Sequence, residues 1–335
     1  MSPVAVADAF AKQVAWCERL GSPFTARVLR AVAGDPPASV RDWAGDPVAD
    51  ALPLRVAGAL HALVLSGHDR GLAARYPPHA PDGIEAEARR ALTAHADVLA
   101  AFLADSPQTN EVGRCGALTP GFLAIAARTG KPLSLLEIGA SAGLNLRWDR
   151  YRYRFGDATW GATGSPVRLA PEWSGSLPPL DASIEIVARA GCDLAPIDVS
   201  DRVARLRLRA YVWADQTERR ARLDAAIGLA LLDPVPIQQS DAAAWLHEAL
   251  PAALGPDHVT VVYHSVVWHY LPAAQQSFVI RTIAAAAATG HPLAWLRYEP
   301  ATPGEPMHLT LRLWPGSGWQ DLAEVHPHGA SVAWR

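Results

Sequence analysis

The sequence has few cysteines and lacks long apolar runs. Of its 335 residues only three are cysteine, namely Cys17, Cys115 and Cys192, and their wide spacing gives neither a CxxC pair nor a disulfide framework. No apolar run reaches about 18 residues, so no membrane-spanning helix is predicted. Residues 1–10 also lack the basic and apolar regions of a secretory signal. We therefore expect a soluble protein of a reducing compartment, with the cytoplasm as its location.

A strong excess of either charge is also absent. The chain has 30 lysines and arginines against 33 aspartates and glutamates, which gives a net charge of -3. Proteins that bind nucleic acid through its phosphates usually carry a large positive excess, so nucleic acid is not an expected partner. Half of the residues are hydrophobic, which excludes a disordered chain and suffices for a large core. The length predicts two domains, or one large domain with an attachment.

Residues 1–108 are predicted to form an all-helical N-terminal domain. Apolar residues recur at spacings of three and four, which predicts helices over 5–20, 24–33, 53–65 and 84–104. Gly-Asp-Pro-Pro at 34–37 interrupts the helical pattern, as does Tyr-Pro-Pro at 76–78. No strand pattern occurs in this part, so we expect a helical cap domain.

Residues 109–335 are predicted to form an α/β domain. A continuous apolar run at 133–138, after a helix at 119–129, is typical of a buried parallel strand. Predicted strands at 184–188, 235–238, 259–263 and 293–298 alternate with predicted helices at 202–232, 242–250 and 273–289, and 308–314 and 322–326 form a C-terminal antiparallel hairpin. This alternation predicts a mostly parallel sheet covered on both faces, with ligands beyond the carboxyl ends of its strands.

The first predicted strand ends in a glycine-rich turn, Glu137-Ile-Gly139-Ala-Ser141-Ala-Gly143. Glycines allow a ligand to approach the backbone closely and present free N–H groups to it. The turn fails the dinucleotide fingerprint G-x-G-x-x-G, because Ser141 stands at the second glycine. It fits the G-x-S-x-G nucleophile elbow of α/β-hydrolases, with Ser141 as the nucleophile. It also resembles the first motif of class I S-adenosylmethionine-dependent methyltransferases, in which an acid precedes the glycines.

The position of this turn along the chain favours the methyltransferase interpretation. Several strands precede the nucleophile elbow in the hydrolase fold, whereas here only helical periodicity precedes the turn. The hydrolase interpretation stays open, because Ser141, Asp241 and His264 occur in the chain order of a hydrolase triad.

The methyltransferase resemblance implies roles for two acids that follow later strands. Asp193 is expected to accept hydrogen bonds from the ribose hydroxyls of the cofactor, and the alternative is that it caps a turn before Pro196. About fifty residues separate the turn from Asp193, where about twenty are usual, so either 151–183 is an insertion or Asp157 takes this role. Asp241 is expected to accept from the adenine amino group, with the backbone N–H of Ala242 against the ring. Asp241 is equally well placed to cap the helix that begins after it.

The fourth predicted strand ends in a segment that resembles the fourth-motif region of small-molecule methyltransferases, Tyr-His264-Ser-Val-Val-Trp-His269-Tyr270. Neutral imidazole titrates near pH 6.5, so His264 is the predicted general base, and His269 or Tyr270 is expected to contact the acceptor. Hydrogen-bonded packing is the alternative for both histidines. Their spacing, with no cysteine nearby, does not predict a metal site.

The chain as a whole resembles an uncharacterised bacterial family, a domain of unknown function. The segments that carry the resemblance are 110–114, 136–146, 191–194, 211–216 and 264–268. Arg114 in the first of them is expected to pair with the carboxylate of the cofactor, and the alternative is a surface charge at an ordinary helix N-terminus.

Together, the resemblances imply a Rossmann-like class I methyltransferase core that uses S-adenosyl-L-methionine to methylate a small molecule. The implied cofactor residues are Glu137, Gly139, Ser141, Gly143, Asp193, Asp241, Ala242 and Arg114. The implied catalytic residues are His264, His269 and Tyr270. A non-catalytic binding protein that retains this fold is the alternative.

Overall fold

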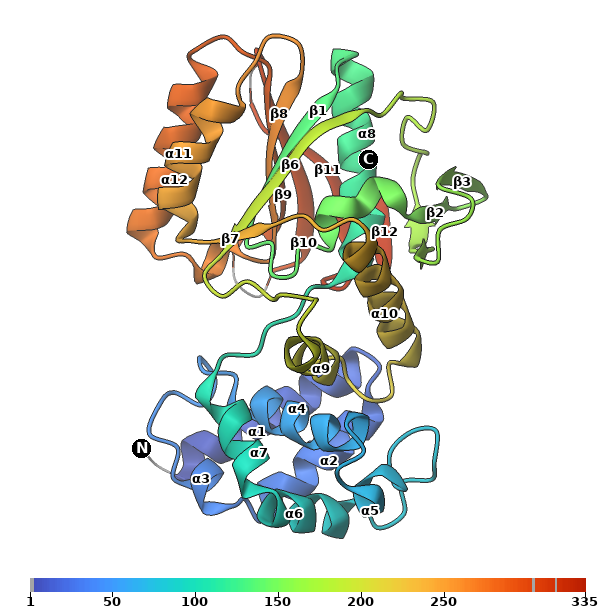
Figure 1. Cartoon of the computed structure of the whole chain (residues 1–335), viewed down its shortest axis with the longest axis vertical. Helices are drawn as coiled ribbons and strands as arrows, with labels where there is room; N and C mark the ends of the chain where they lie inside the picture. Colours follow the sequence, from blue (N-terminus) through green and yellow to red (C-terminus); the bar gives the residue numbers. More distant parts are fainter. Residues whose placement is uncertain (1–2, 303–304, 317) are drawn as a thin grey trace. The chain divides into compact units, whose positions relative to one another are not determined.

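The structure is a computed structural model, and it describes residues 3–302, 305–316 and 318–335. The chain forms two compact units (Figure 1). One consists of Met1–Thr109 with Asp198–Asp224, and the other of Asn110–Ile197 with Ala225–Arg335. The first boundary lies one residue from the predicted one. Segment 198–224, which was predicted to belong to the α/β domain, belongs instead to the helical unit.

The helical unit is built from amphipathic helices, as their apolar periodicity predicts. They are α1 (Pro3–Arg19), α2 (Pro23–Gly34), α3 (Ala38–Arg41), α4 (Leu52–Leu65), α5 (Arg70–Ala73), α6 (Ile84–Ala94), α7 (Ala96–Ala104), α9 (Arg202–Ala210) and the start of α10 (Thr217–Leu232). Their buried side chains form one core, which Tyr211 and Trp213 join from the second stretch of chain. The helix predicted over 84–104 is divided at His95. None of the described helices has the length and apolar character needed to cross a bilayer.

The α/β unit contains a nine-stranded sheet in the order β5-β12-β11-β10-β9-β8-β1-β6-β7. The strands are β1 (Leu133–Ile138), β5 (Glu172–Ser174), β6 (Ile186–Asp193), β7 (Ile237–Gln239), β8 (Val259–Ser265), β9 (Leu293–Pro300), β10 (Met307–Trp314), β11 (Gln320–Val325) and β12 (Ser331–Trp334). Strands β7, β6, β1, β8 and β9 run parallel, whereas β10 pairs antiparallel with both β9 and β11. The predicted α/β class and the C-terminal hairpin are confirmed.

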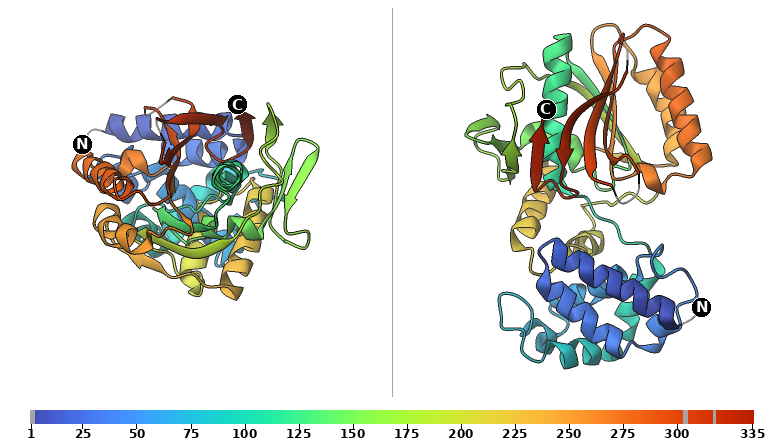
Figure 2. Two further views of the ribbon diagram at one scale, coloured as in Figure 1. Left: turned by 90° about the horizontal axis from the view of Figure 1, so that it is seen from above. Right: turned by 180° about the vertical axis from the view of Figure 1, so that it is seen from behind.

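Helices cover both faces of the sheet, because alternate residues of its buried strands are apolar on both sides (Figure 2). Helices α11 (Ala242–Ala253) and α12 (Ala273–Ala287) share a core with Trp295 of β9. Helix α8 (Cys115–Thr129) packs on the opposite face, where a Cβ added at Gly121 would lie 2.8 Å from Leu296, the next residue of β9.

Residues 145–169 hold the irregular part of this unit. The turn after β1 leads into the short helix η2 (Asn145–Arg150). A separate three-stranded sheet follows, formed by β2 (Arg152–Phe155), β3 (Ala158–Gly161) and β4 (Arg168–Leu169). The short strand predicted at 151–155 is confirmed as β2.

Candidate functional site

The strand order places a topological switch point between β1 and β8. From β1 the chain extends to β6 and β7 on one side, and from β8 it extends to β9 on the other. In open α/β sheets, ligands bind outside the carboxyl ends of the strands at such a point. The glycine turn follows β1 and residues 266–271 follow β8. A Cβ added at Gly139 would lie 2.4 Å from Cγ2 of Val267, so the two motif segments contact each other at this edge.

The backbone of the glycine turn is left-handed at three positions. The φ angles are +69° at Gly139, +52° at Ser141 and +65° at Gly143. A Cβ added at Gly143 would lie 2.7 Å from Cδ1 of Ile237. Both glycines are therefore explained by their φ angles and by close packing, since Val267 and Ile237 make the close approaches that were predicted for a cofactor.

Ser141 is strained and its hydroxyl is unused. A positive φ at a residue other than glycine costs about 1 kcal/mol or more. The side chain is 6% exposed, and its Oγ is buried without a hydrogen-bond partner. The backbone of Ser141 is well bonded, because its N–H donates to Oδ2 of Asp193 at 2.9 Å and its carbonyl accepts from Ile197 N–H at 3.1 Å. A buried hydroxyl without a partner is a hydrogen-bonding group available to a ligand.

Asp193 lies beside the glycine turn, at the end of β6. Cys192 pairs with Ile138 of β1, and the Asp193 carboxylate bridges the N–H groups of Ser141 and Ala195, the latter at 3.0 Å. Asp157 lies in the exposed turn between β2 and β3 of the small sheet. Its bond to Ala195 N–H caps the turn before Pro196, as the alternative interpretation predicted. Of the two acids proposed for the ribose, only Asp193 is next to the glycine turn, and its ribose role stays a prediction.

Asp241 caps α11, as the alternative interpretation predicted. Its Oδ1 accepts from the N–H groups of Ala243 and Ala244, both at 3.0 Å, and its Oδ2 accepts from Gln275. Ser240 N–H donates to the carbonyl of Asp193 at 3.0 Å, which joins the ends of β6 and β7. Asp241 and Ala242, the first residue of α11, thus lie directly after Ser240, which is hydrogen-bonded to Asp193 at the end of β6. The adenine role of Asp241 and Ala242 stays a prediction.

Glu137 is buried inside the α/β unit and is mostly uncharged at pH 7. It is 1% exposed, and Tyr263 donates its hydroxyl to Oε2 at 3.0 Å. Burial raises the pKa of Glu137 to about 8, and the nearby charge of Asp193 adds to the rise. Its hydrogen bond goes to β8, so the acid before the glycines connects two central strands.

His264 is not positioned as a general base, which corrects the prediction. It is fully buried, and its Nδ1 lies 2.7 Å from Oε1 of Glu299. The indole N–H of Trp295 donates to Nε2 at 3.2 Å. These partners assign the proton to Nδ1 and leave neither nitrogen for an acceptor. The packing alternative therefore applies to this histidine.

Glu299 is the site residue that the sequence did not reveal. Besides His264, its Oε1 accepts from the N–H groups of Val267 and Trp268, at 2.8 and 3.2 Å. Burial alone would raise the pKa of Glu299, but the hydrogen bond from His264 and the two N–H donors lower it overall. Glu299 thus fixes the loop after β8. The available signal was the alternation of Trp, Arg and Glu at 295, 297 and 299, which puts two charges on one face of a buried strand.

His269 and Tyr270 are the solvent-exposed pair of the predicted catalytic group. They lie in η3 (Trp268–Tyr270), with their ring centres 3.9 Å apart and Tyr270 74% exposed. Both follow Trp268, which stacks on His264. They are therefore accessible to an acceptor at the switch-point edge, and their catalytic role stays a prediction.

Arg114 contacts backbone rather than an acid among its described hydrogen bonds. Its Nη1–H donates to the carbonyl of Ser265 at 3.0 Å, and its Nε–H donates to the carbonyl of Pro327 at 3.1 Å. Arg114 thus connects the end of β8 to the segment before β12. Its expected pairing with a cofactor carboxylate stays a prediction.

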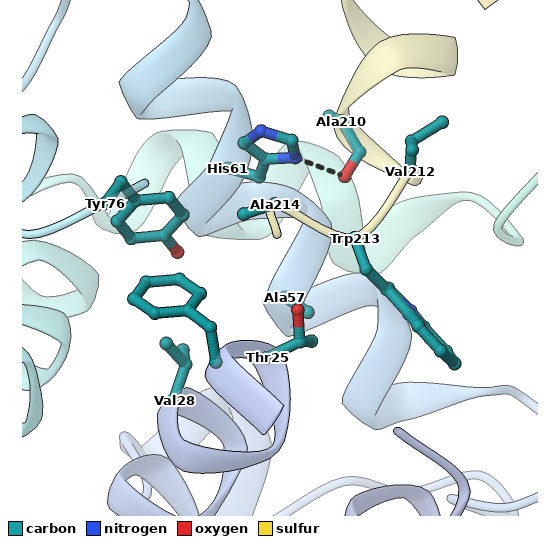
Figure 3. A pocket seen from close by; sticks show the side chains of 10 residues that line it. Thr25, Val28, Ala57, His61, Tyr76, Ala210, Val212, Trp213 and Ala214 are labelled. Atoms are coloured by element: carbon teal, nitrogen blue, oxygen red, sulfur yellow. Dashed lines mark hydrogen bonds between the residues drawn. The ribbon is translucent and has the colours of Figure 1, made fainter. Parts of the chain in front are cut away.

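Neither of two cavities is lined by the glycine turn, by Asp193 or by residues 264–271. In the helical unit, a cavity of about 10 Å³, room for about one water molecule, is lined by His61 and Tyr76 among others (Figure 3). In the α/β unit, a groove of about 560 Å³ is lined by β5, β10, β11 and β12. Its volume falls in the range of small-molecule sites, and neither cavity was predicted from the sequence.

Comparison with known proteins gives one match. No curated protein and no solved structure matches the chain. A family model described as "Uncharacterized protein conserved in bacteria (DUF2332)" matches residues 7–334, which include nearly all of both units. The predicted resemblance to an uncharacterised bacterial family is confirmed, and the chain belongs to this family of proteins conserved in bacteria.

Proposed function

We propose that the α/β unit is a Rossmann-like methyltransferase core that binds S-adenosyl-L-methionine at Ser141 and Asp193, rather than against Gly139 and Gly143, which Val267 and Ile237 cover, and that it methylates a small molecule. The observation that carries the proposal is the position of Asp193, which ends the strand next to β1 and contacts the turn through Ser141. The strand order supports it, because β7-β6-β1-β8-β9 is the third-second-first-fourth-fifth order of a doubly wound fold.

Two side chains at the turn fit the proposed cofactor. A carboxylate offers about four acceptor positions, so that of Asp193 suits a pair of adjacent ribose hydroxyls. The buried Ser141 Oγ has no partner, and a bound polar ligand would satisfy it. When bound, the cofactor supplies a reactive sulfonium methyl group. The residues of the chain would hold the reactants in line and exclude water.

Proton removal in this proposal does not involve His264. Both of its ring nitrogens are engaged by Glu299 and Trp295. An acceptor that must lose a proton would pass it to exposed His269 or to water. This arrangement favours acceptors that are already nucleophilic at neutral pH.

Calorimetric titration with S-adenosylhomocysteine tests the cofactor site. We expect binding to the parent protein and a roughly 10–100-fold loss of affinity in Asp193→Ala, because charged hydrogen bonds of this kind contribute about 1.5–3 kcal/mol. Asp157→Ala is the matched control and should bind as the parent does. Thermal unfolding of Asp193→Ala without ligand shows whether the substitution distorts the glycine turn. The milder Asp193→Asn removes the charge but keeps an acceptor oxygen for the turn. No binding by the parent, or equal affinity in Asp193→Ala, contradicts the proposal.

A serine hydrolase is the second candidate, favoured by the positive φ of Ser141 within G-x-S-x-G. Against it, residues 3–132 of the structure contain no strand before β1, and His264 does not have a free nitrogen to serve as the base. Labelling of Ser141 by a fluorophosphonate probe, absent in Ser141→Ala, would replace the methyltransferase proposal with the hydrolase.

A further inference from the structure

Two arginines lie as diagonal neighbours on one face of the β9–β10 pair. Trp295, Arg297 and Glu299 alternate along β9, and they share the face of the sheet on which α11 and α12 pack. Arg297 pairs with Thr310 of β10, and Trp295 pairs with Arg312. Diagonal positions in an antiparallel pair are within reach of long side chains, so the two guanidinium groups project over the same area.

Tryptophan rings surround the first of these guanidinium groups. The central carbon of Arg297 lies 5.0 Å, 5.3 Å and 5.2 Å from the ring centres of Trp268, Trp295 and Trp319. The central carbon of Arg312 lies 4.7 Å from the ring of Trp314. These are cation–π distances. Ring contacts of this kind do not use the N–H donors, which point outward in the plane of the guanidinium.

The donors of both arginines are left without an acid. The Nε atoms of Arg297 and Arg312 are buried and have no hydrogen-bond partner, and neither arginine forms an ion pair within the described part of the chain. Burial lowers the pKa of Arg297, as expected for a partly desolvated cation. A buried donor without a partner is costly, and an anionic group at this place would remove that cost.

The acids nearest to this pair in the sheet form their hydrogen bonds with other groups, although the charge of Glu299 acts on Arg297. Glu299 accepts from His264 and from two backbone N–H groups. Asp321 of β11 accepts from His308 at 3.0 Å and from Arg335. The two cations thus lie among aromatic rings, and neither forms an ion pair with these two carboxylates.

We propose that Arg297 and Arg312 form a binding site for a small organic anion, whose carboxylate or phosphate group the two guanidinium groups hold while its planar part packs on the tryptophans. Arginine suits this role because its fork of donors matches both anionic groups bidentately. The surrounding Trp268, Trp314 and Trp319 provide apolar surface for an aromatic or unsaturated ligand. The inference does not depend on the proposed methyl transfer.

Calorimetric titration with phenyl phosphate and phenylacetate tests the site, with benzyl alcohol as the uncharged probe. We expect at least one anion to bind, no binding of benzyl alcohol, and an affinity that falls as salt is raised. Arg297→Gln and Arg312→Gln should each weaken binding by about 10-fold or more, because each removes charged hydrogen bonds. Arg154→Gln, an exposed arginine of the small sheet, should bind as the parent does. The tighter of the two anions identifies the group that the site takes.

Separate control experiments test whether the variants fold and whether the anion site is independent of the proposed cofactor site. Because both glutamine variants lose cation–π contacts, we expect them to melt up to about 6 °C below the parent protein but to be folded at the temperature of the titration. Asp193→Ala should keep anion binding, so failure of the methyltransferase proposal leaves this result unaffected. No saturable binding of either anion by the parent, or unchanged affinity in both glutamine variants, overturns the site.

Discussion

The helical unit and the α/β unit each bury an ionisable side chain, and the two side chains lose their charge for the same reason but with opposite consequences. His61 of α4 is 3% exposed and donates Nδ1–H to the carbonyl of Ala210, and burial lowers its pKa to about 4. Burial of Glu137 raises its pKa to about 8. Both are mostly uncharged at pH 7. Lowering the pH therefore destabilises the folded protein through His61, and raising the pH destabilises it through Glu137.

The two units also differ in where their buried side-chain nitrogen and oxygen atoms lack hydrogen-bond partners. Within residues 5–109, no buried side-chain nitrogen or oxygen lacks a hydrogen-bond partner, whereas in the second stretch of the helical unit Nε of Arg222 on α10 lacks one. In the α/β unit, Ser141 Oγ, Glu299 Oε2 and Arg297 Nε all lack one. Natural proteins rarely leave such atoms unused, and here they lie at or near the carboxyl edge of the parallel strands. Residues 5–109 therefore satisfy their own buried polar side chains, whereas the α/β unit retains unused hydrogen-bonding groups near that edge.

The largest effect is expected from Glu137 as pH rises. Its pKa is 4.5 before folding and about 8 after, so the folded protein holds the extra proton between these values. The free energy of unfolding should therefore fall from pH 4.5 to 8 by about 4–5 kcal/mol, at about 1.4 kcal/mol per pKa unit. Glu137→Gln should lack this fall. Hydrogen exchange of peptides covering β1 and β8 measures it.

The control for Glu137 is Glu248→Gln, which alters an exposed glutamate of α11 in the same unit. It should keep the parental dependence on pH. If Glu137→Gln and the parent show the same slope between pH 4.5 and 8, Glu137 does not carry the buried proton.

His61 is expected to give the next largest effect, in the opposite direction. Its pKa falls from 6.5 to about 4 on folding, so the unfolded chain binds the extra proton in this window. The stabilisation is complete above pH 6.5 and should be lost as pH falls to 4, by about 3 kcal/mol. Hydrogen exchange of α4 peptides measures the loss. His61→Asn should abolish this loss, whereas His79→Asn, at an exposed position, should keep it. Hydrogen exchange of α4 that does not change between pH 6.5 and 4 would refute the assignment.

The smallest effects come from paired substitutions that compare the two units directly. Asp215 accepts from Phe24 N–H at 3.0 Å and from the hydroxyls of Ser22 and Thr25 at the start of α2, so Asp215→Ala should cost about 2 kcal/mol. Ser141→Ala should change stability by less than about 0.5 kcal/mol, because Oγ has no partner to lose. Urea unfolding measures both. Equal costs would remove the contrast between the units.

Sequence periodicity predicted the elements whose signal is local. The helices over 5–20 and 24–33 correspond to α1 and α2, and the strand at 133–138 matches β1 residue for residue. Strands β5 and β12 were missed, because they are short and become strands by pairing with each other across the sequence. Segment 198–224 was assigned to the wrong unit, since an amphipathic helix does not specify which core it covers.

The candidate site was predicted where a motif coincides with a strand end. Asp193 lies beside the glycine turn as expected. His264 was misassigned because its partners, Glu299 and Trp295, come from another strand 35 and 31 residues away. Arg297 was not singled out for a similar reason: the alternation at 295, 297 and 299 places two charges on one face, but strand pairing brings Arg312 beside Arg297. A sequence shows which residue types can do chemistry, but only the fold shows which of them are already engaged.

The division of the helical unit into two stretches of chain affects how the protein is made. When Thr109 leaves the ribosome, the nascent helices still lack Asp215 at the start of α2 and the Ala210 carbonyl that pairs with His61. At about 5–20 residues per second, synthesis of the missing stretch takes a further 5–20 seconds or so. During that interval β1 and β6 emerge, so a chain truncated at Thr109 is released with part of its own interior absent.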